Sequence, residues 1–95
     1  MKRHKHIQVM GKTIKVEHVK NLEKDGGLFG DCSGDKLLIR IDSDLSDRDY
    51  ILTLQHEILH MIFHLSGITY ILNKTAGLEE SIVRCIENNF LDIKL

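Results

Sequence analysis

The sequence predicts an α+β domain, in which a small antiparallel β-sheet formed by residues 6–42 packs against two helices. Three observations lead to this class. Apolar residues alternate with polar ones before residue 42, apolar residues recur at helical spacing over 46–66, and a second helical pattern runs from 78 to about 92. With 95 residues, the chain has room for one domain, which we assign to residues 6–95 behind a basic tail at 1–5.

The N-terminal third of the sequence is typical of two β-hairpins. The first is indicated by alternating apolar residues around a two-residue glycine turn: Ile7, Val9, the turn Gly11-Lys12, Ile14 and Val16. The second is indicated by apolar residues around a polar turn: Leu28–Cys32, the turn Ser33-Gly34-Asp35, and then Leu37, Ile39 and Ile41. We expect the strand at residues 37–41 to be an exposed edge, where an extended peptide can bind.

A long helix is predicted for residues 46–66. Ser46 is a suitable N-cap, and Asp47 and Asp49 place negative charge in the first turn. Two apolar stripes are expected along the helix, the first of Ile51, Leu54, Ile58, Met61, Ile62 and Leu65 and the second of Leu52, Leu59 and Phe63. A helix that is apolar on most sides is expected to lie in the centre of the fold. The segment 68–77 that follows has no clear period and is predicted as a loop or short turn.

A polar wedge interrupts the apolar surface of this helix. Five polar side chains fall within an arc of roughly 100° on the helical wheel: Thr53, His56, Glu57, His60 and His64. Polar groups that cluster on a buried helix need a shared partner. Residues 56–60 have the pattern H-E-x-x-H, in which two imidazoles one helical turn apart can bind the same zinc ion.

The motif suggests a chemical role for each of its polar residues. His56 and His60 are the predicted ligands of one zinc ion per chain. Glu57 lies about 100° round the helix from His56, where it can take a proton from a zinc-bound water. The predicted reaction is therefore hydrolysis of an amide bond.

A catalytic zinc ion needs one more protein ligand besides two histidines and a water. Glu79 and Glu80 begin the second predicted helix, about twenty positions after His60, and Glu87 follows two turns later. On the helical wheel, Glu79 lies at the centre of the apolar face and Glu80 about 100° away at its border. Geometry alone favours Glu79, and acidic residues in a first helical turn also have a purely structural role.

The order of H-E-x-x-H, about twenty residues, and E-x-x-V at residues 80–83 resembles the gluzincins, in which a glutamate is the third zinc ligand. This resemblance implies Glu80 as the third ligand in preference to Glu79. The small size and the hairpins ahead of the helix resemble more narrowly the minimal metallopeptidases of bacteria and phages related to the ImmA/IrrE type. Over roughly residues 7–90, the resemblance implies a zincin-like fold and a zinc metalloendopeptidase that acts on an extended peptide, with a cytoplasmic regulatory protein as a possible natural substrate.

Several positions depart from the patterns of known zinc peptidases. Ser66 stands where metzincins have a third histidine, which disfavours that family. Arg84 stands four residues after Glu80, where thermolysin-like enzymes have an acidic residue that orients a zinc-binding histidine. The groups around the histidines must therefore differ. The residue that stabilises the oxyanion is left open between His64 and Tyr70, and His64 itself is expected beside the metal or facing solvent.

Composition and charge argue against several other functions. The net charge of −1 gives no electrostatic signal for nucleic acid or an anionic membrane, and only the first residues are basic. No apolar run approaches the ~20 residues of a membrane span and no signal peptide is recognisable, so a cytoplasmic protein is predicted. Cys32 and Cys85 have no metal-binding spacing and are expected to be reduced and structural.

One alternative from another class stays open, namely a zinc-stabilised interaction module without catalytic activity. Glu57 argues against it, because a structural zinc site is closed by four protein ligands and has no use for a carboxylate beside the metal.

Overall fold

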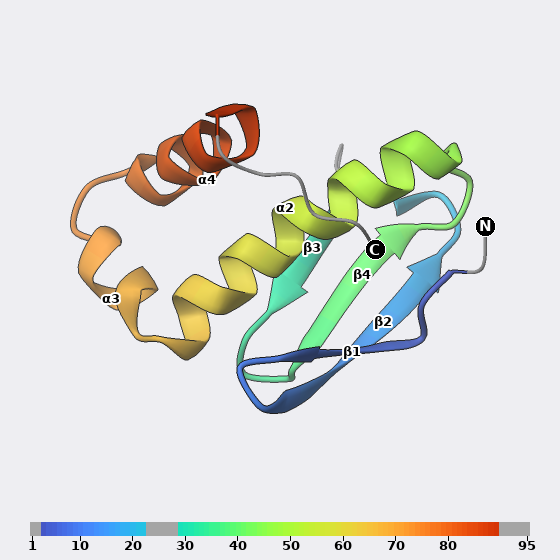
Figure 1. The fold of residues 1–95 in the computed structure, drawn as a ribbon, viewed down its shortest axis with the longest axis horizontal. Helices are drawn as coiled ribbons and strands as arrows, with labels where there is room; N and C mark the ends of the chain where they lie inside the picture. The colour runs from blue at the N-terminus through green and yellow to red at the C-terminus, as the bar shows by residue number, and fades with distance from the viewer. Residues whose placement is uncertain (1–2, 23–28, 90–95) are drawn as a thin grey trace.

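The computed structural model describes residues 3–22 and 29–89. These residues form an α+β fold in which one four-stranded sheet packs against a long helix (Figure 1). The strands are β1 (His6–Val9), β2 (Lys12–Val19), β3 (Gly30–Ser33) and β4 (Leu38–Asp42), and the helices are α2 (Asp47–Leu65), α3 (Ile68–Leu72) and α4 (Leu78–Asn89). The predicted α+β class is therefore confirmed.

The sheet is mixed, with the strand order β1-β2-β4-β3. The antiparallel pairs of β1 with β2 and of β3 with β4 confirm the two hairpins, although Leu28 lies outside the described residues. The predicted second turn is displaced, because Ser33 pairs with Leu38 and the turn therefore spans residues 34–37. The hairpins meet through the parallel pair of β2 and β4, so the prediction of a wholly antiparallel sheet is wrong. Alternating apolar residues identify a strand but not its direction relative to a distant strand, and that direction depends on the connection between the hairpins.

The pairing corrects two further predictions about the strands. Val9 pairs with Lys12, so the first turn consists of Met10 and Gly11 and not of Gly11 and Lys12. Both turn residues have positive φ, 52° and 77°, as a type I′ turn requires. The expected edge strand at 37–41 is also wrong, because β4 lies between β2 and β3. Its side chains Ile39 and Ile41 are fully buried, and β3 forms the edge beside α2.

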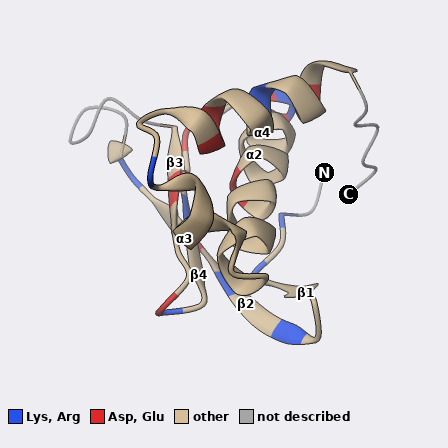
Figure 2. Ribbon diagram, turned by 90° about the vertical axis from the view of Figure 1, so that its left-hand side faces the viewer, with Lys and Arg blue, Asp and Glu red and all other residues tan. Residues whose placement is uncertain are grey.

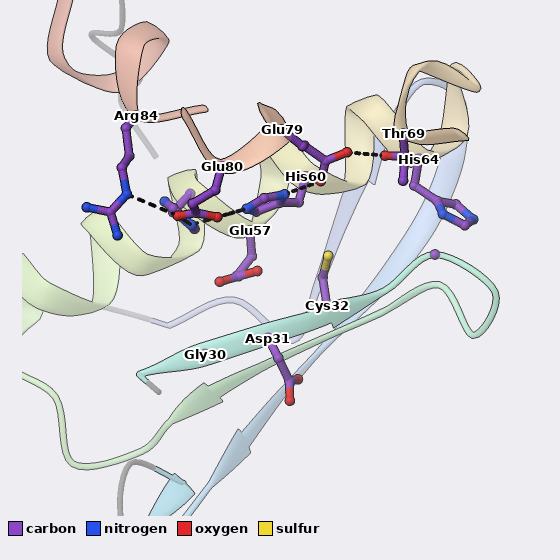
Figure 3. Close-up of a pocket in the computed structure, with 12 residues that line it drawn as sticks. Gly30, Asp31, Cys32, Glu57, His60, His64, Thr69, Glu79, Glu80 and Arg84 are labelled. Atoms are coloured by element: carbon purple, nitrogen blue, oxygen red, sulfur yellow. Dashed lines mark hydrogen bonds and ion pairs between the residues drawn. The ribbon is translucent and has the colours of Figure 1, made fainter. Parts of the chain in front are cut away.

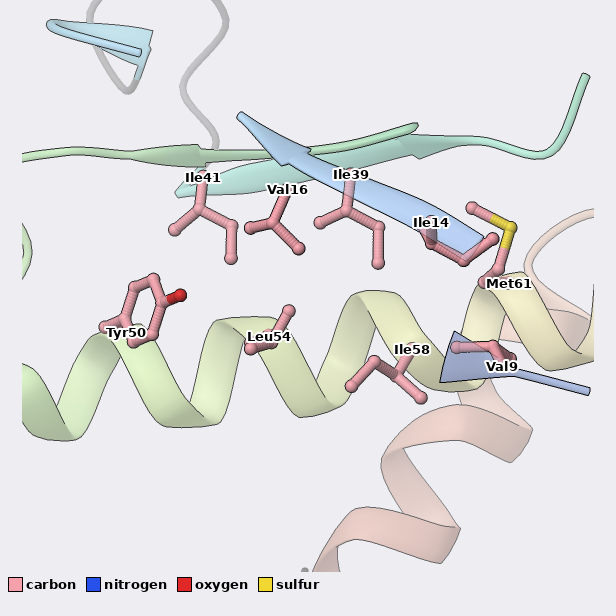
Figure 4. Packing of buried hydrophobic residues seen from close by; sticks show 9 residues of the cluster. All are labelled: Val9, Ile14, Val16, Ile39, Ile41, Tyr50, Leu54, Ile58 and Met61. Atoms are coloured by element: carbon pink, nitrogen blue, oxygen red, sulfur yellow. The ribbon is translucent and has the colours of Figure 1, made fainter. Parts of the chain in front are cut away.

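Helix α2 agrees closely with its predicted bounds. The side chain of Ser46 accepts a hydrogen bond from the backbone N–H of Asp49 at 3.2 Å, which caps the first turn. The first apolar stripe packs against the sheet (Figure 4), in a core of Val9, Ile14, Val16, Ile39, Ile41, Tyr50, Leu54, Ile58 and Met61. None of the described helices has the length and apolar character needed to cross a membrane.

Helix α4 packs against the second apolar stripe of α2. Leu59 and Phe63 form a small buried cluster with Val83, the one described residue of α4 that is buried. Leu52 is 47% exposed, so the second stripe is confirmed only toward the C-terminal end of α2. The segment predicted as a loop or short turn contains the five-residue helix α3, and the predicted extension of α4 to Asp92 lies outside the described residues.

The described part of the basic tail contacts the domain. Arg3 donates hydrogen bonds to the carbonyl oxygens of Ser43 at 3.3 Å and Leu45 at 2.6 Å. Its guanidinium also lies 4.6 Å from the centre of the Tyr50 ring. These contacts attach residue 3 to the start of α2, so this residue is not free in solvent.

Candidate metal centre

An open pocket of about 520 Å³ lies where α2, the start of α4 and β3 meet. Helix α2 turns its polar wedge into this pocket, with four of the five wedge residues on the wall: His56, Glu57, His60 and His64. The acidic first turn of α4 lies above the space between β3 and α2 (Figure 2). The wedge therefore faces carboxylates from a second helix.

The two histidines of the motif and Glu80 converge on one point. The Nε2 atoms of His56 and His60 lie 3.2 Å apart. The carboxylate of Glu80 lies 3.0 Å from Nε2 of His56 through one oxygen and 2.8 Å from Nε2 of His60 through the other (Figure 3). Among the described residues, these three form the group whose ligand atoms all lie within 4.8 Å of one another.

The opposite ring nitrogens of the same histidines also contact carboxylates. Nδ1 of His56 lies 2.7 Å from an oxygen of Glu87, and Nδ1 of His60 lies 2.5 Å from an oxygen of Glu79. The second oxygen of Glu79 accepts a hydrogen bond from the Thr69 hydroxyl at 2.5 Å. Glu79 and Glu80 thus contact different atoms of His60, although they are neighbours in the sequence.

The surrounding charges change the pKa values of His60 and Glu80. Burial lowers the pKa of His60, but hydrogen bonds to Glu79 and Glu80 outweigh burial, and the pKa lies above its ordinary value. Burial raises the pKa of Glu80, but His56 and His60 outweigh it and bring the pKa below the ordinary value. The carboxylate of Glu80 is therefore favoured in its charged form, as a metal ligand must be.

Glu57 occupies a different part of the pocket from the three converging residues. Its side chain is buried and points from α2 toward β3, where the Cys32 thiol points back toward it (Figure 3). Burial raises the pKa of Glu57, although His56 acts in the opposite direction. Burial and the charge of Glu57 raise the pKa of Cys32 to about 12, so this residue is a neutral thiol near pH 7.

Gly30 allows β3 to pass close to α2 at this site. A Cβ atom at residue 30 would lie 2.8 Å from the backbone oxygen of Arg40 and 2.8 Å from Cγ2 of Thr53. Both distances are shorter than real Cβ contacts. Thr53, the remaining member of the polar wedge, therefore contacts the edge strand.

The other predicted site residues lie at the margins of the pocket. His64 lines it and lies 3.6 Å from the Asp35 carboxylate, outside the group of three. Tyr70 is 62% exposed and its ring centre lies 5.6 Å from that of His64. Arg84 donates a hydrogen bond to Glu80 at 3.3 Å, so the position that departs from the thermolysin-like pattern contacts the predicted ligand and neither histidine.

Sequence reasoning missed the roles of three residues at this site: Glu87, which contacts His56, and Thr69 and Cys32, which line the pocket. Glu87 lies seven positions after Glu80, which is two helical turns on the same face, and this spacing is a signal that two successive carboxylates face α2. Thr69 and Cys32 come from segments that only the tertiary fold brings to the pocket, and their sequence context gives no such signal.

Comparison with known proteins gives no relative for this chain. No protein-family model matches it, and no curated protein or solved structure resembles it closely enough to count as a match.

Proposed function

We propose that the chain is a zinc metallopeptidase of minimal, zincin-like form, with His56, His60 and Glu80 as the metal ligands. The observation that carries the proposal is the close spacing of ligand atoms from three residues. In a tetrahedral zinc site with bonds of ~2.0–2.1 Å, ligand atoms lie roughly 3.3 Å apart. Here the two Nε2 atoms lie 3.2 Å apart, and the two oxygens of Glu80 lie 3.0 Å from Nε2 of His56 and 2.8 Å from Nε2 of His60.

The chemistry of these atoms also fits a cation. A carboxylate can only accept a hydrogen bond, so Glu87 and Glu79 favour the hydrogen on Nδ1 of His56 and of His60. Each neutral imidazole then has its lone pair on Nε2. Two lone pairs and the Glu80 carboxylate point at one another, and this arrangement is repulsive unless a cation or extra protons lie between them. A divalent metal ion meets that requirement at neutral pH.

Three protein ligands support a catalytic site over a structural one. Structural zinc sites have four protein ligands, whereas catalytic sites have three and an open position for water or substrate. Cys32, the described cysteine in the pocket, is outside the group of converging atoms and has a strongly raised pKa. With these three ligands, a bound zinc ion would keep one position for water or substrate.

Glu57 is the residue we assign to proton transfer. When bound, zinc supplies a Lewis acid that polarises the scissile carbonyl and makes a nearby water more acidic. Glu57 shares the pocket with the two histidines but is not among the converging ligands, so its carboxylate is available to accept a proton from that water. Its raised pKa allows it to hold that proton and donate it to the leaving amine.

The edge strand offers a binding surface for an extended peptide. In the described sheet, β3 pairs with β4 on one side only, and Gly30, Asp31 and Cys32 line the pocket. Backbone groups on the free side of β3 can therefore align a substrate strand beside Glu57. This role was predicted for residues 37–41, but β4 lies inside the sheet, so we assign the role to β3.

The test is digestion of a broad peptide library by purified protein loaded with zinc. We expect internal cleavage by the wild type and a loss of about 10²–10⁴-fold in rate for Glu57→Gln, because a positioned acid or base contributes that much. Glu57→Gln should keep its zinc and its fold. If the wild type binds zinc but cleaves nothing, the zinc-stabilised interaction module becomes the better account.

A further inference from the structure

Each of the two histidines has a carboxylate beside its Nδ1 atom, and neither carboxylate belongs to the zinc motif. Glu87 contacts Nδ1 of His56 at 2.7 Å, and Glu79 contacts Nδ1 of His60 at 2.5 Å. Each of these glutamates is about 20% exposed, with values of 22% and 20%. Both contact Nδ1 and not Nε2, so both lie on the far side of the imidazoles from the point of convergence.

The direction of the helices explains why these two residues fulfil that role. The earlier histidine contacts the later glutamate and the later histidine contacts the earlier glutamate, so α2 and α4 run in opposite directions along the site. Glu79 and Glu87 are eight positions apart, or about 12 Å along a helix, and they bracket Glu80. Arg84, four residues after Glu80, bonds to Glu80 and supplies no acceptor for a histidine.

We propose that Glu79 and Glu87 are positioning residues, which hold His60 and His56 with Nε2 toward the metal. The inference rests on the proposed zinc site. A carboxylate behind a metal-binding imidazole fixes the tautomer, fixes the ring orientation and makes the ligand more basic. Glu79 is thereby assigned a role that differs from that of its neighbour Glu80.

Thr69 extends the contact behind His60 to another part of the chain. Its hydroxyl donates to the second oxygen of Glu79, which leaves the first oxygen to accept from Nδ1 of His60. Thr69 lies in α3, which begins after Gly67 in a left-handed conformation with φ of 83°. The short helix thus helps to fix the orientation of the Glu79 carboxylate, and with it the imidazole of His60.

The test measures zinc affinity of the full chain by competition with a chromophoric chelator, and coordination by the visible absorption of the cobalt-substituted protein. Glu79→Gln and Glu87→Gln should each weaken zinc binding by about 10–100-fold and leave the cobalt spectrum tetrahedral, because the ligands themselves remain. Glu80→Gln should weaken zinc binding further and change the cobalt spectrum. Glu87→Asp should bind zinc more tightly than Glu87→Gln, since it keeps a charged acceptor.

The matched control is Asp31→Asn, which removes a carboxylate of the same pocket that pairs with Arg40 and with no histidine. It should change zinc affinity less than either glutamate variant, which separates positioning from a general loss of negative charge. Circular dichroism of the metal-free variants checks that each one folds. If Glu79→Gln does not fold, the zinc affinity and cobalt spectrum of Glu87→Gln alone are compared with those of Asp31→Asn.

Two results would overturn the inference. Zinc affinities of Glu79→Gln and Glu87→Gln no weaker than that of Asp31→Asn would show that neither glutamate positions a ligand. A change of the cobalt spectrum in Glu79→Gln, with a spectrum like the wild type in Glu80→Gln, would make Glu79 the ligand. Both results require a wild type that binds zinc, so they differ from failure of the proposed function, in which the wild type binds none.

Discussion

Val83 connects the metal centre to the stability of the fold, because it is the buried residue through which α4 packs on α2. Its side chain is fully buried against Leu59 and Phe63. Val83→Ala removes two methyl groups from this cluster. At ~0.8 kcal/mol for each buried group, and with a further contribution from the cavity left behind, the free energy of unfolding should fall by about 2 kcal/mol. In a domain of this size, that loss lowers Tm by about 8–16 °C.

The assay is urea denaturation of the chelator-treated protein, compared with the control Leu52→Ala on the exposed side of α2. Leu52 is 47% exposed, so its truncation should change the free energy of unfolding much less. Added zinc should recover part of the stability of Val83→Ala, because Glu80 on α4 and the histidines on α2 then share one ion. Equal losses for Val83→Ala and Leu52→Ala would refute the claim that this contact attaches α4.

Two further predictions concern the edge strand and the titrating groups of the site. Gly30→Ala should reduce the free energy of unfolding by about 1–3 kcal/mol, since the new Cβ meets a backbone oxygen and Thr53 at 2.8 Å. Urea denaturation measures this loss, and a stability within error of the wild type would contradict the close approach of β3 to α2. The pKa of His60 is raised above its ordinary value, so its protonated form stabilises the fold, and the metal-free protein should lose stability as pH rises from 7 to 8. This interval lies above the range of His18, whose pKa is lowered by burial. Zinc affinity should rise over the same interval because zinc displaces the proton from His60, and melting curves and chelator competition at both pH values check the two opposite trends.

Local patterns in the sequence predicted most of the elements of the fold. The cap at Ser46 and the uninterrupted run to Leu65 define α2 because they depend on contacts within one helix. Both hairpins followed from alternating apolar residues and turns. The parallel pairing of β2 with β4 was not predictable in this way, since it joins residues about 23 positions apart through a connection that leaves no periodic signal.

In the candidate site too, the sequence predicted what depends on one helix and not what depends on how two helices pack. The polar wedge of α2 faces one pocket as its helical spacing requires, and the structure brings Glu80 to both Nε2 atoms and Glu79 to Nδ1 of His60. The helical wheel could rank Glu79 above Glu80 by burial but could not tell which face of an imidazole each carboxylate would meet. That distinction depends on how α4 is placed on α2, which Val83 and the opposite direction of the helices decide. Zinc binding and catalysis stay predictions.

The zinc content of the purified protein tests the central claim most directly. The full chain is expressed without a histidine tag in zinc-replete medium, passed over a desalting column and analysed by mass spectrometry of the metal. We expect one zinc ion per chain in the wild type, and little or none in His56→Ala or His60→Ala, each of which removes one of two imidazole ligands. A wild type that is folded by circular dichroism and carries no zinc, or histidine variants that retain as much zinc as the wild type, would contradict the account.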